Sequence, residues 1–102
     1  MRAVDFIPYY AVIFTSKLAD SNGYAKIAAE MEILAKQQEG FISIESARQE
    51  VGINVSYWKD VESIQRWKQN FDHLKAQQLG KEKWYESYTV RIAKIEREYS
   101  FK

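Results

Sequence analysis

The segment Tyr9–Leu18 (YYAVIFTSKL) constrains the fold most, because it opens with a run of residues that are apolar on both sides. Side chains along a β-strand point alternately to the two faces of a sheet. The alternation gives each face three apolar residues: Tyr10, Val12 and Phe14 on one, and Tyr9, Ala11 and Ile13 on the other. Both faces of this strand therefore need cover, and one layer of helices covers only one of them.

Two helices are predicted from apolar residues that recur every three or four positions. The first begins at a capping signal over residues 20–23 and runs to about Gln38, with Gly40 as its stop. The second begins after the capping residue Asp60, and Gly80 ends or interrupts it. Its apolar stripe consists of Ile64, Trp67, Phe71 and Leu74.

Three further strands are predicted from alternating apolar residues. They cover residues 41–48, residues 53–59 and roughly residues 86–99. The short gap between the first two predicts an antiparallel hairpin. In the last strand the apolar residues change parity, which predicts a β-bulge near Ala93 and Lys94.

The resulting order, β-α-β-β-α-β, predicts an α+β fold of the ferredoxin-like type. In that fold a four-stranded antiparallel sheet carries both helices on one face. The length of 102 residues allows one domain, spanning positions 1–102. The aromatic content of 15% exceeds what one small core usually needs, so it indicates an interface or a pocket. A second copy of the chain is the expected cover of the other sheet face, and the sequence predicts a homodimer.

Composition excludes several classes of function. Zero Cys rules out a disulfide framework, a cysteine zinc site and a thiol nucleophile, and with one His no metal site is expected. A net charge of +1 gives no field that would attract nucleic acid or an anionic membrane. The apolar run near the N-terminus is neither a membrane span nor a signal peptide, so a cytoplasmic protein is expected.

His73 has the ordinary pKa closest to neutrality among the side-chain types present, which suits it to acid–base chemistry. On the second helix it lies about 240° round from Trp67, on a flank that it shares with Arg66, Asn70 and Gln77. This flank is either a solvated helix face or the polar rim of a pocket between the helix and the sheet. Trp67 itself is either a core residue or an aromatic wall for a flat ligand.

Four parts of the chain together indicate a family: YYAVIF in the first strand, GFISIESAR and GINVSYW in the hairpin, IQRWKQNFDHLKAQQLG in the second helix, and WYESYTVRIAKIEREY at the last strand. From about Tyr9 to Phe101 the chain resembles the antibiotic biosynthesis monooxygenase (ABM) family. The resemblance implies a dimeric α+β barrel, in which two ferredoxin-like sheets close against each other. Some members oxygenate flat aromatic substrates with O2 and without metal or flavin. Others bind haem and degrade it.

The resemblance also implies site residues. Haem-degrading members use an Asn on the first strand, a helical Trp and a His ten residues later. Trp67 matches the Trp, but Gln77 stands at the position of the His and the first strand has no Asn, so haem degradation is disfavoured. Substrate-oxygenating members place a polar aromatic group about six residues after the Trp, where this chain has His73.

Two functions are therefore expected. The first is a cofactor-independent monooxygenase for a small aromatic or quinone-like metabolite. In it His73 and Trp67 are the expected catalytic residues, and Asn70, Gln77 and Phe71 the expected ligand contacts. The alternative is a non-catalytic dimeric module that binds haem or another flat ligand.

Overall fold

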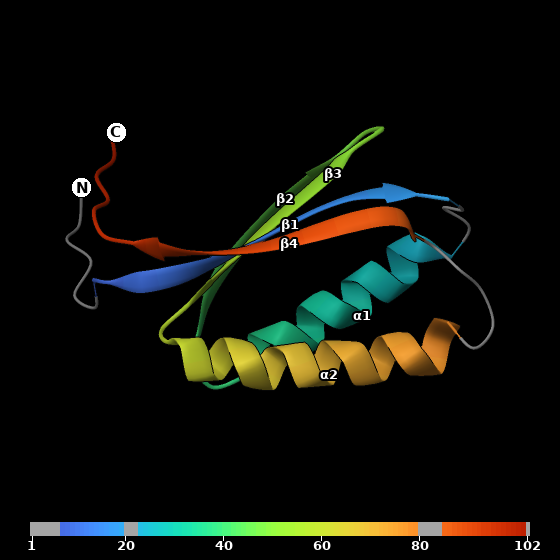
Figure 1. The fold of residues 1–102 in the computed structure, drawn as a ribbon, viewed down its shortest axis with the longest axis horizontal. Helices are drawn as coiled ribbons and strands as arrows, with labels where there is room; N and C mark the ends of the chain where they lie inside the picture. Colours follow the sequence, from blue (N-terminus) through green and yellow to red (C-terminus); the bar gives the residue numbers. More distant parts are fainter. Residues whose placement is uncertain (1–6, 20–22, 80–84, 102) are drawn as a thin grey trace.

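β1 (Tyr9–Leu18) is an inner strand of the sheet, as its two apolar faces require. The computed structural model describes residues 7–19, 23–79 and 85–101, with the side chains of the second helix described as far as Asp72. The further elements are α1 (Tyr24–Lys36), β2 (Phe41–Arg48), β3 (Gly52–Trp58), α2 (Val61–Leu79) and β4 (Tyr85–Ile95). The strands form one antiparallel sheet in the order β2-β3-β1-β4, and both helices lie on one side of it (Figure 1). The predicted ferredoxin-like fold is confirmed.

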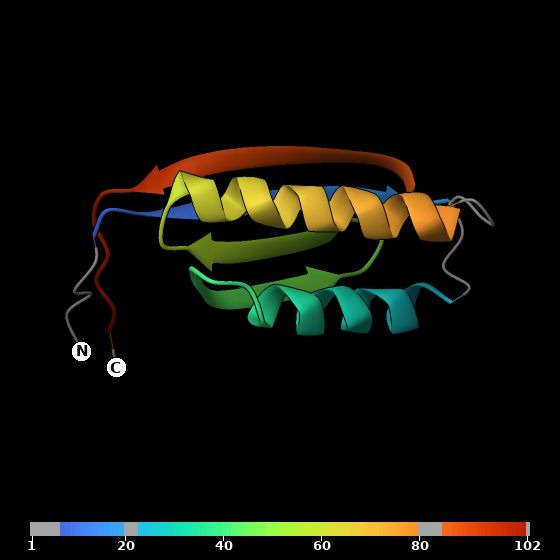
Figure 2. The same ribbon diagram turned by 90° about the horizontal axis from the view of Figure 1, so that it is seen from below.

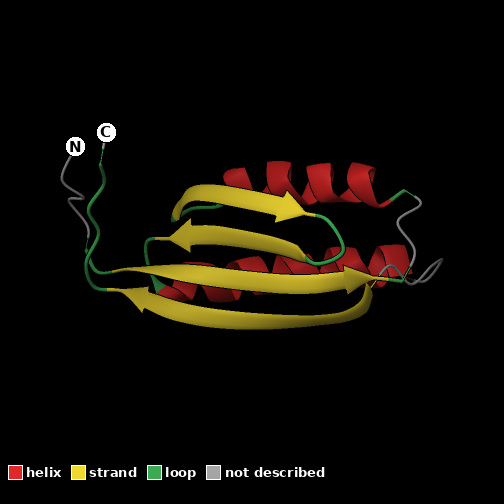
Figure 3. Ribbon diagram, turned by 90° about the horizontal axis from the view of Figure 1, so that it is seen from above, coloured by secondary structure: helices red, strands yellow, loops and turns green. Residues whose placement is uncertain are grey.

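The register of the sheet decides which residues share a face. Val12 lies opposite Ser56 of β3 and Ile92 of β4, and all three line the space between the sheet and the helices. Ala11 and Ile13 have the other parity, so they point to the side that α1 and α2 leave uncovered. We call this side the open face; Figure 2 views the sheet from the helix side and Figure 3 from the open face. The alternation predicted for β1 is therefore confirmed.

The core of the helix side is built around Trp58, which is 0% exposed. Its cluster of buried residues consists of Val12, Ala35, Trp58 and Ile64. The Trp58 indole stacks on that of Trp67, with ring centroids 6.0 Å apart, and its Nε1–H donates to Ser56 Oγ at 2.8 Å. Trp58 thus joins β3 to α2 without leaving its polar atom unpaired.

Glycines mark both ends of α1. Gly23 precedes the helix with a φ of 82° and offers no side-chain cap, while residues 20–22 of the predicted capping signal lie outside the described residues. The helix ends at Lys36, slightly before the predicted end. Gly40 then turns the chain into β2 with a φ of 90°, and a Cβ at this position would collide with Ser63 of α2. Only glycine meets both demands at position 40.

The predicted β-bulge near residues 93–94 is wrong. There β4 pairs continuously with β1 as far as Ile95, and the register shift lies at the other end of β1, between Lys17 and Leu18. Ile95 lies opposite Tyr9 on the open face. The change of parity in the sequence therefore reflects apolar residues on both faces of β4, with no extra residue inserted. β4 also ends at Ile95, short of the predicted limit.

Asp60 caps α2, as predicted. Its Oδ1 accepts a hydrogen bond from the backbone N–H of Ser63 at 2.8 Å. Hydrogen bonds from the side chain and the backbone of Ser63 lower the pKa of the Asp60 carboxyl. The ionised form is therefore favoured in the folded state.

We expect Asp60→Ala to lower the free energy of unfolding by about 0.5–2 kcal/mol at pH 7, the usual value of an N-cap. Because the pKa is lowered on folding, this stabilisation is present above the unfolded value of 3.8 and is lost as the pH falls through the folded pKa. Urea unfolding of both proteins should therefore show a difference that shrinks below pH 4. Asp60→Asn keeps the acceptor without the charge, so a matching pH dependence in Asp60→Asn would contradict this account.

Candidate functional site

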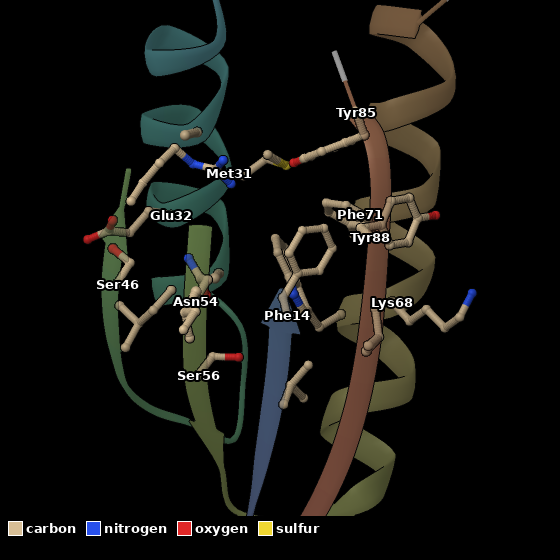
Figure 4. A pocket seen from close by; sticks show the side chains of 18 of the residues that line it. Phe14, Met31, Glu32, Ser46, Asn54, Ser56, Lys68, Phe71, Tyr85 and Tyr88 are labelled. Carbon is tan, nitrogen blue, oxygen red and sulfur yellow. The ribbon is translucent and has the colours of Figure 1, made fainter. Parts of the chain in front are cut away.

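A cavity of about 650 Å³ lies between the helix side of the sheet and the two helices. Figure 4 shows α1 on one side, α2 and β4 on the other, and β1 and β3 between them. Apolar side chains make up most of its lining. Volumes of roughly 300–1,000 Å³ with such a lining are typical of sites for small organic ligands.

The cavity exists because its two walls differ in side-chain size. The wall formed by α1 consists largely of alanines and one flexible methionine: Ala25, Ala28, Met31 and Ala35. The opposite wall carries Trp67 and Phe71 of α2 together with Tyr85 and Tyr88 of β4. Tyr24, at the start of α1, meets Tyr85 edge-on with ring centroids 5.7 Å apart. Beyond this contact the small residues of α1 leave space for a ligand in front of the other rings.

Phe14 stands at the centre of the aromatic wall. Its ring is stacked on Tyr88 at 5.1 Å and meets Phe71 and Tyr85 edge-on at 5.8 and 5.6 Å. Figure 4 shows Phe14 rising from β1 beside Phe71 and Tyr88, while Met31 and Tyr85 point toward each other across the cavity. These rings offer a flat ligand several faces and edges on which to stack.

Polar groups of the lining are few, and among the uncharged ones Ser56 is buried, at 5% exposed. Ser46, Asn54 and Ser56 lie on β2 and β3. Lys68 is paired with Asp72 of the same helix at 2.6 Å, and this pair is exposed. Glu32 of α1 pairs with Lys36 at 3.2 Å. The two rim carboxylates are thus neutralised by neighbouring lysines.

A further set of polar side chains lies at the end of the cavity near the β2–β3 hairpin. Arg48 donates a hydrogen bond from Nη2 to Ser16 Oγ, and its Cζ lies 5.1 Å from the centre of the Tyr24 ring. The Tyr85 hydroxyl donates to the Tyr24 hydroxyl at 3.3 Å. Burial, followed by the hydrogen bond to Tyr24, raises the pKa of Tyr85, so this phenol stays neutral at physiological pH.

The structure brings two of the predicted site residues to the cavity. Trp67 and Phe71 line it, and Trp67 also packs against the buried core cluster, so it has features of both interpretations. Asn70 is exposed and does not line it; its Nδ2 donates to Gln38 Oε1 at 3.0 Å. His73 and Gln77 lie in α2, but their side chains are outside the described residues.

Helix geometry limits what position 73 can do. With about 100° per residue, it lies about 200° round the axis of α2 from Phe71 and about 240° from Trp67. Both of these residues line the cavity. Position 73 of the backbone therefore lies on the side of the helix axis away from these two residues.

Arg48, Tyr24, Tyr85 and Tyr88 were not predicted as site residues. The sequence does contain one signal for Arg48: it ends the predicted second strand, and Gly52 lies directly before the predicted third strand, across a short turn. In the sheet these two residues are direct partners. An arginine opposite a glycine can lay its guanidinium across the neighbouring strand, because glycine has no side chain to prevent it.

The described part of the chain holds no group of three or more His, Cys, Asp or Glu that could bind a metal ion. Within the same residues, neither helix is long and apolar enough to cross a membrane. The expected absence of a metal cofactor stays a prediction.

This sheet and its two helices have the fold of the ABM-like proteins. SnoaB from Streptomyces nogalater, a cofactor-independent oxygenase, superposes with a TM-score of 0.67 and 11% identity, over 91% of this chain and 96% of SnoaB. A Nitrosomonas europaea protein provisionally named an antibiotic biosynthesis monooxygenase superposes with a TM-score of 0.66 and 9% identity, over 90% of this chain and 93% of that protein. A mutant of MhuD has two manganese protoporphyrin IX bound per active site. It superposes with a TM-score of 0.64 and 12% identity, over 90% of this chain and 99% of the MhuD chain. At these identities the likeness establishes the fold alone.

The chain belongs to the same family as YqjZ, an uncharacterised protein of Bacillus subtilis. The two are 44% identical over 97 residues, which cover 92% of this chain and 85% of YqjZ. No family model matches the chain.

Proposed function

We propose that this protein is a cofactor-independent monooxygenase that acts on a small aromatic or quinone-like metabolite. The observation that carries the proposal is the cavity of about 650 Å³ with its wall of stacked and edge-on aromatic rings. The shared fold with SnoaB, a cofactor-independent oxygenase, supports the reaction class. We place the activity in the cytoplasm, the compartment expected from the sequence.

The reaction would use the substrate as the source of electrons. An activated CH2 of an aromatic ketone loses a proton, and the carbanion transfers an electron to O2. Recombination forms the C–O bond of a hydroperoxide, which loses water and leaves a carbonyl group. The balance is CH2 + O2 → C=O + H2O: the carbon loses four electrons, one oxygen atom enters the product and the other leaves as water.

Within this proposal Trp67 and Phe71 hold the plane of the substrate against Phe14. A fixed orientation of the ring and exclusion of water favour formation of the carbanion and its encounter with O2. The assignment of His73 as the base, and of Asn70 and Gln77 as ligand contacts, stays a prediction. The position of residue 73 on α2 means that such a base would have to act from the edge of the cavity.

The proposal is tested by a thermal-shift screen of anthrones and hydroxynaphthoquinones, followed by O2 uptake with each compound that raises the unfolding temperature. We expect consumption of one O2 per substrate in buffer with a chelator and without added flavin. With ¹⁸O2, one labelled atom should appear in the product and one in water. Failure of every aromatic compound to stabilise the protein would contradict an aromatic site.

The second candidate is a binding module for haem or another flat ligand. The MhuD mutant, which binds two manganese porphyrins per active site, has the same fold and supports this alternative. A saturable Soret shift on addition of haem, without loss of the porphyrin band over time, would favour binding without degradation. Aromatic ligands that bind but consume no O2 would favour the same class.

We also propose that the protein is a homodimer whose two open faces meet. On the open face the inner strands carry apolar residues such as Ile13 and Val55, while Glu45 and Arg91 lie on the outer strands in the same row. An apolar centre with charged edges is the usual composition of a homodimer interface.

We expect sedimentation at micromolar concentration to give twice the 12.0 kDa mass of the chain. Val55→Glu should give a folded monomer, because Val55 lies opposite Ile13 on the open face and a charge facing its own copy would be buried without a partner. The matched control is Ile33→Glu: Ile33 of α1 is 58% exposed and lies away from the open face, so this variant should stay dimeric. A wild-type protein that sediments as a monomer would contradict the proposal.

A further inference from the structure

Arg48 lies where the cavity meets the β2–β3 hairpin. It is the last residue of β2, and its sheet partner is Gly52, which in turn lies opposite Ser16 of β1. The hydrogen bond from Arg48 Nη2 to Ser16 Oγ shows that the side chain crosses β3 along this row. The guanidinium therefore lies on the helix side of the sheet, where Arg48 contributes to the lining of the cavity.

Three neighbours hold the guanidinium in this place. Ser16, which is buried, accepts one of its hydrogen bonds. Gly52 leaves the space that it occupies, because a Cβ there would collide with the Arg48 guanidinium. The ring of Tyr24 lies 5.1 Å from Cζ and contributes a cation–π contact. A guanidinium positioned in this way loses little freedom when it binds a ligand.

Within the described residues, the charge of Arg48 differs from the other charges of the lining in having no carboxylate partner. Lys68 is paired with Asp72 at 2.6 Å, and Glu32 is paired with Lys36 at 3.2 Å. Among the same residues no carboxylate lies within 4 Å of the Arg48 guanidinium. Tyr85 adds no competing negative charge, because burial raises its pKa and keeps it neutral.

We propose that Arg48 binds the carboxylate of a planar aromatic ligand, so that the substrate of this site is an aromatic carboxylate. The inference rests on the proposed function for the aromatic part of the ligand and adds the anionic group. A carboxylate is fully ionised at neutral pH and matches the fork of N–H donors on a guanidinium. With its carboxylate at Arg48, a flat ligand would extend along Phe14 toward Trp67, between the alanines of α1 and the aromatic wall.

The test compares two probes of nearly the same shape, anthraquinone-2-carboxylate and anthraquinone-2-carboxamide, by titration calorimetry at low ionic strength. We expect the wild-type protein to bind the carboxylate at least tenfold more tightly than the carboxamide. Arg48→Met keeps the apolar stem and removes the charge, so the ratio should fall to near one with little change for the carboxamide. Lys68→Met is the matched control: it removes a cation that is already paired, so the ratio of the two affinities should equal that of the wild-type protein.

A second variant moves the guanidinium without removing its charge. In Gly52→Ala the new Cβ takes the place of the end of a flexible side chain, so the fold should tolerate it while the guanidinium shifts. We expect this variant to reduce the preference for the carboxylate several-fold.

The outcomes separate the two proposals. Equal binding of both probes by the wild-type protein, or a carboxylate preference that survives Arg48→Met, would overturn the role of Arg48 and leave the aromatic site standing. Failure of the protein to bind either probe would overturn the aromatic site and this inference with it.

Discussion

Trp58→Ala should lower the free energy of unfolding by about 3–5 kcal/mol, the usual cost of truncating a buried aromatic residue. Trp58 is 0% exposed and packs between Phe41 and Trp67, so its removal leaves a void that these rings cannot fill. The stability of a domain of this size is about 5–15 kcal/mol in total. The variant should therefore unfold at a much lower denaturant concentration, measured by far-ultraviolet circular dichroism at a fixed protein concentration.

The control for this variant is Phe101→Ala, because Phe101 is 100% exposed. It removes an aromatic ring that is not packed in the core, so the free energy of unfolding should change by no more than about 0.5 kcal/mol. Trp58→Phe should fall between the two, since it keeps a ring in the core but loses the donor to Ser56 Oγ. Similar losses of stability for Trp58→Ala and Phe101→Ala would show that the core is centred elsewhere.

The fold could be predicted because its signals are local. The alternation in Tyr9–Leu18, the helical spacing after Asp60 and the short hairpin each follow from side chains a few positions apart. Their order leaves few topologies, and the ferredoxin-like fold is the common one among them. The bulge was predicted wrongly because the parity of an isolated strand does not reveal that both of its faces carry apolar residues, as those of β4 do at Ile92 and Ile95.

The site could be predicted only in part, because a cavity depends on which residues face each other across the fold. Trp67 and Phe71 stand out within one helix, whereas the space beside them is created by alanines of another. Likewise, Arg48 becomes a site residue only when the sheet register brings it over Gly52 to Ser16. Neither relation is periodic in the sequence.

We expect Ala28→Trp to weaken binding of anthraquinone-2-carboxamide about tenfold to a hundredfold. Ala28 lines the cavity from α1, opposite the aromatic wall. An indole at this position would fill the space itself, and burial of such a side chain stabilises the folded state by roughly 1.5–3 kcal/mol. A ligand would have to displace the indole and lose this stabilisation. Because about 1.4 kcal/mol corresponds to a tenfold change in Kd, this loss gives the expected tenfold to hundredfold weakening.

Ala29→Trp provides the matched control, because Ala29 is the next residue of the same helix but is exposed and does not line the cavity. It should bind the probe with the affinity of the wild-type protein. The two variants should also differ in stability: Ala28→Trp fills a void, so its free energy of unfolding should be unchanged or higher. If Ala28→Trp were destabilised by several kcal/mol, the space beside α1 would be packed in solution. If it were stable and bound the probe unchanged, the ligand would occupy some other part of the protein, and the cavity could not be the site of the proposed chemistry.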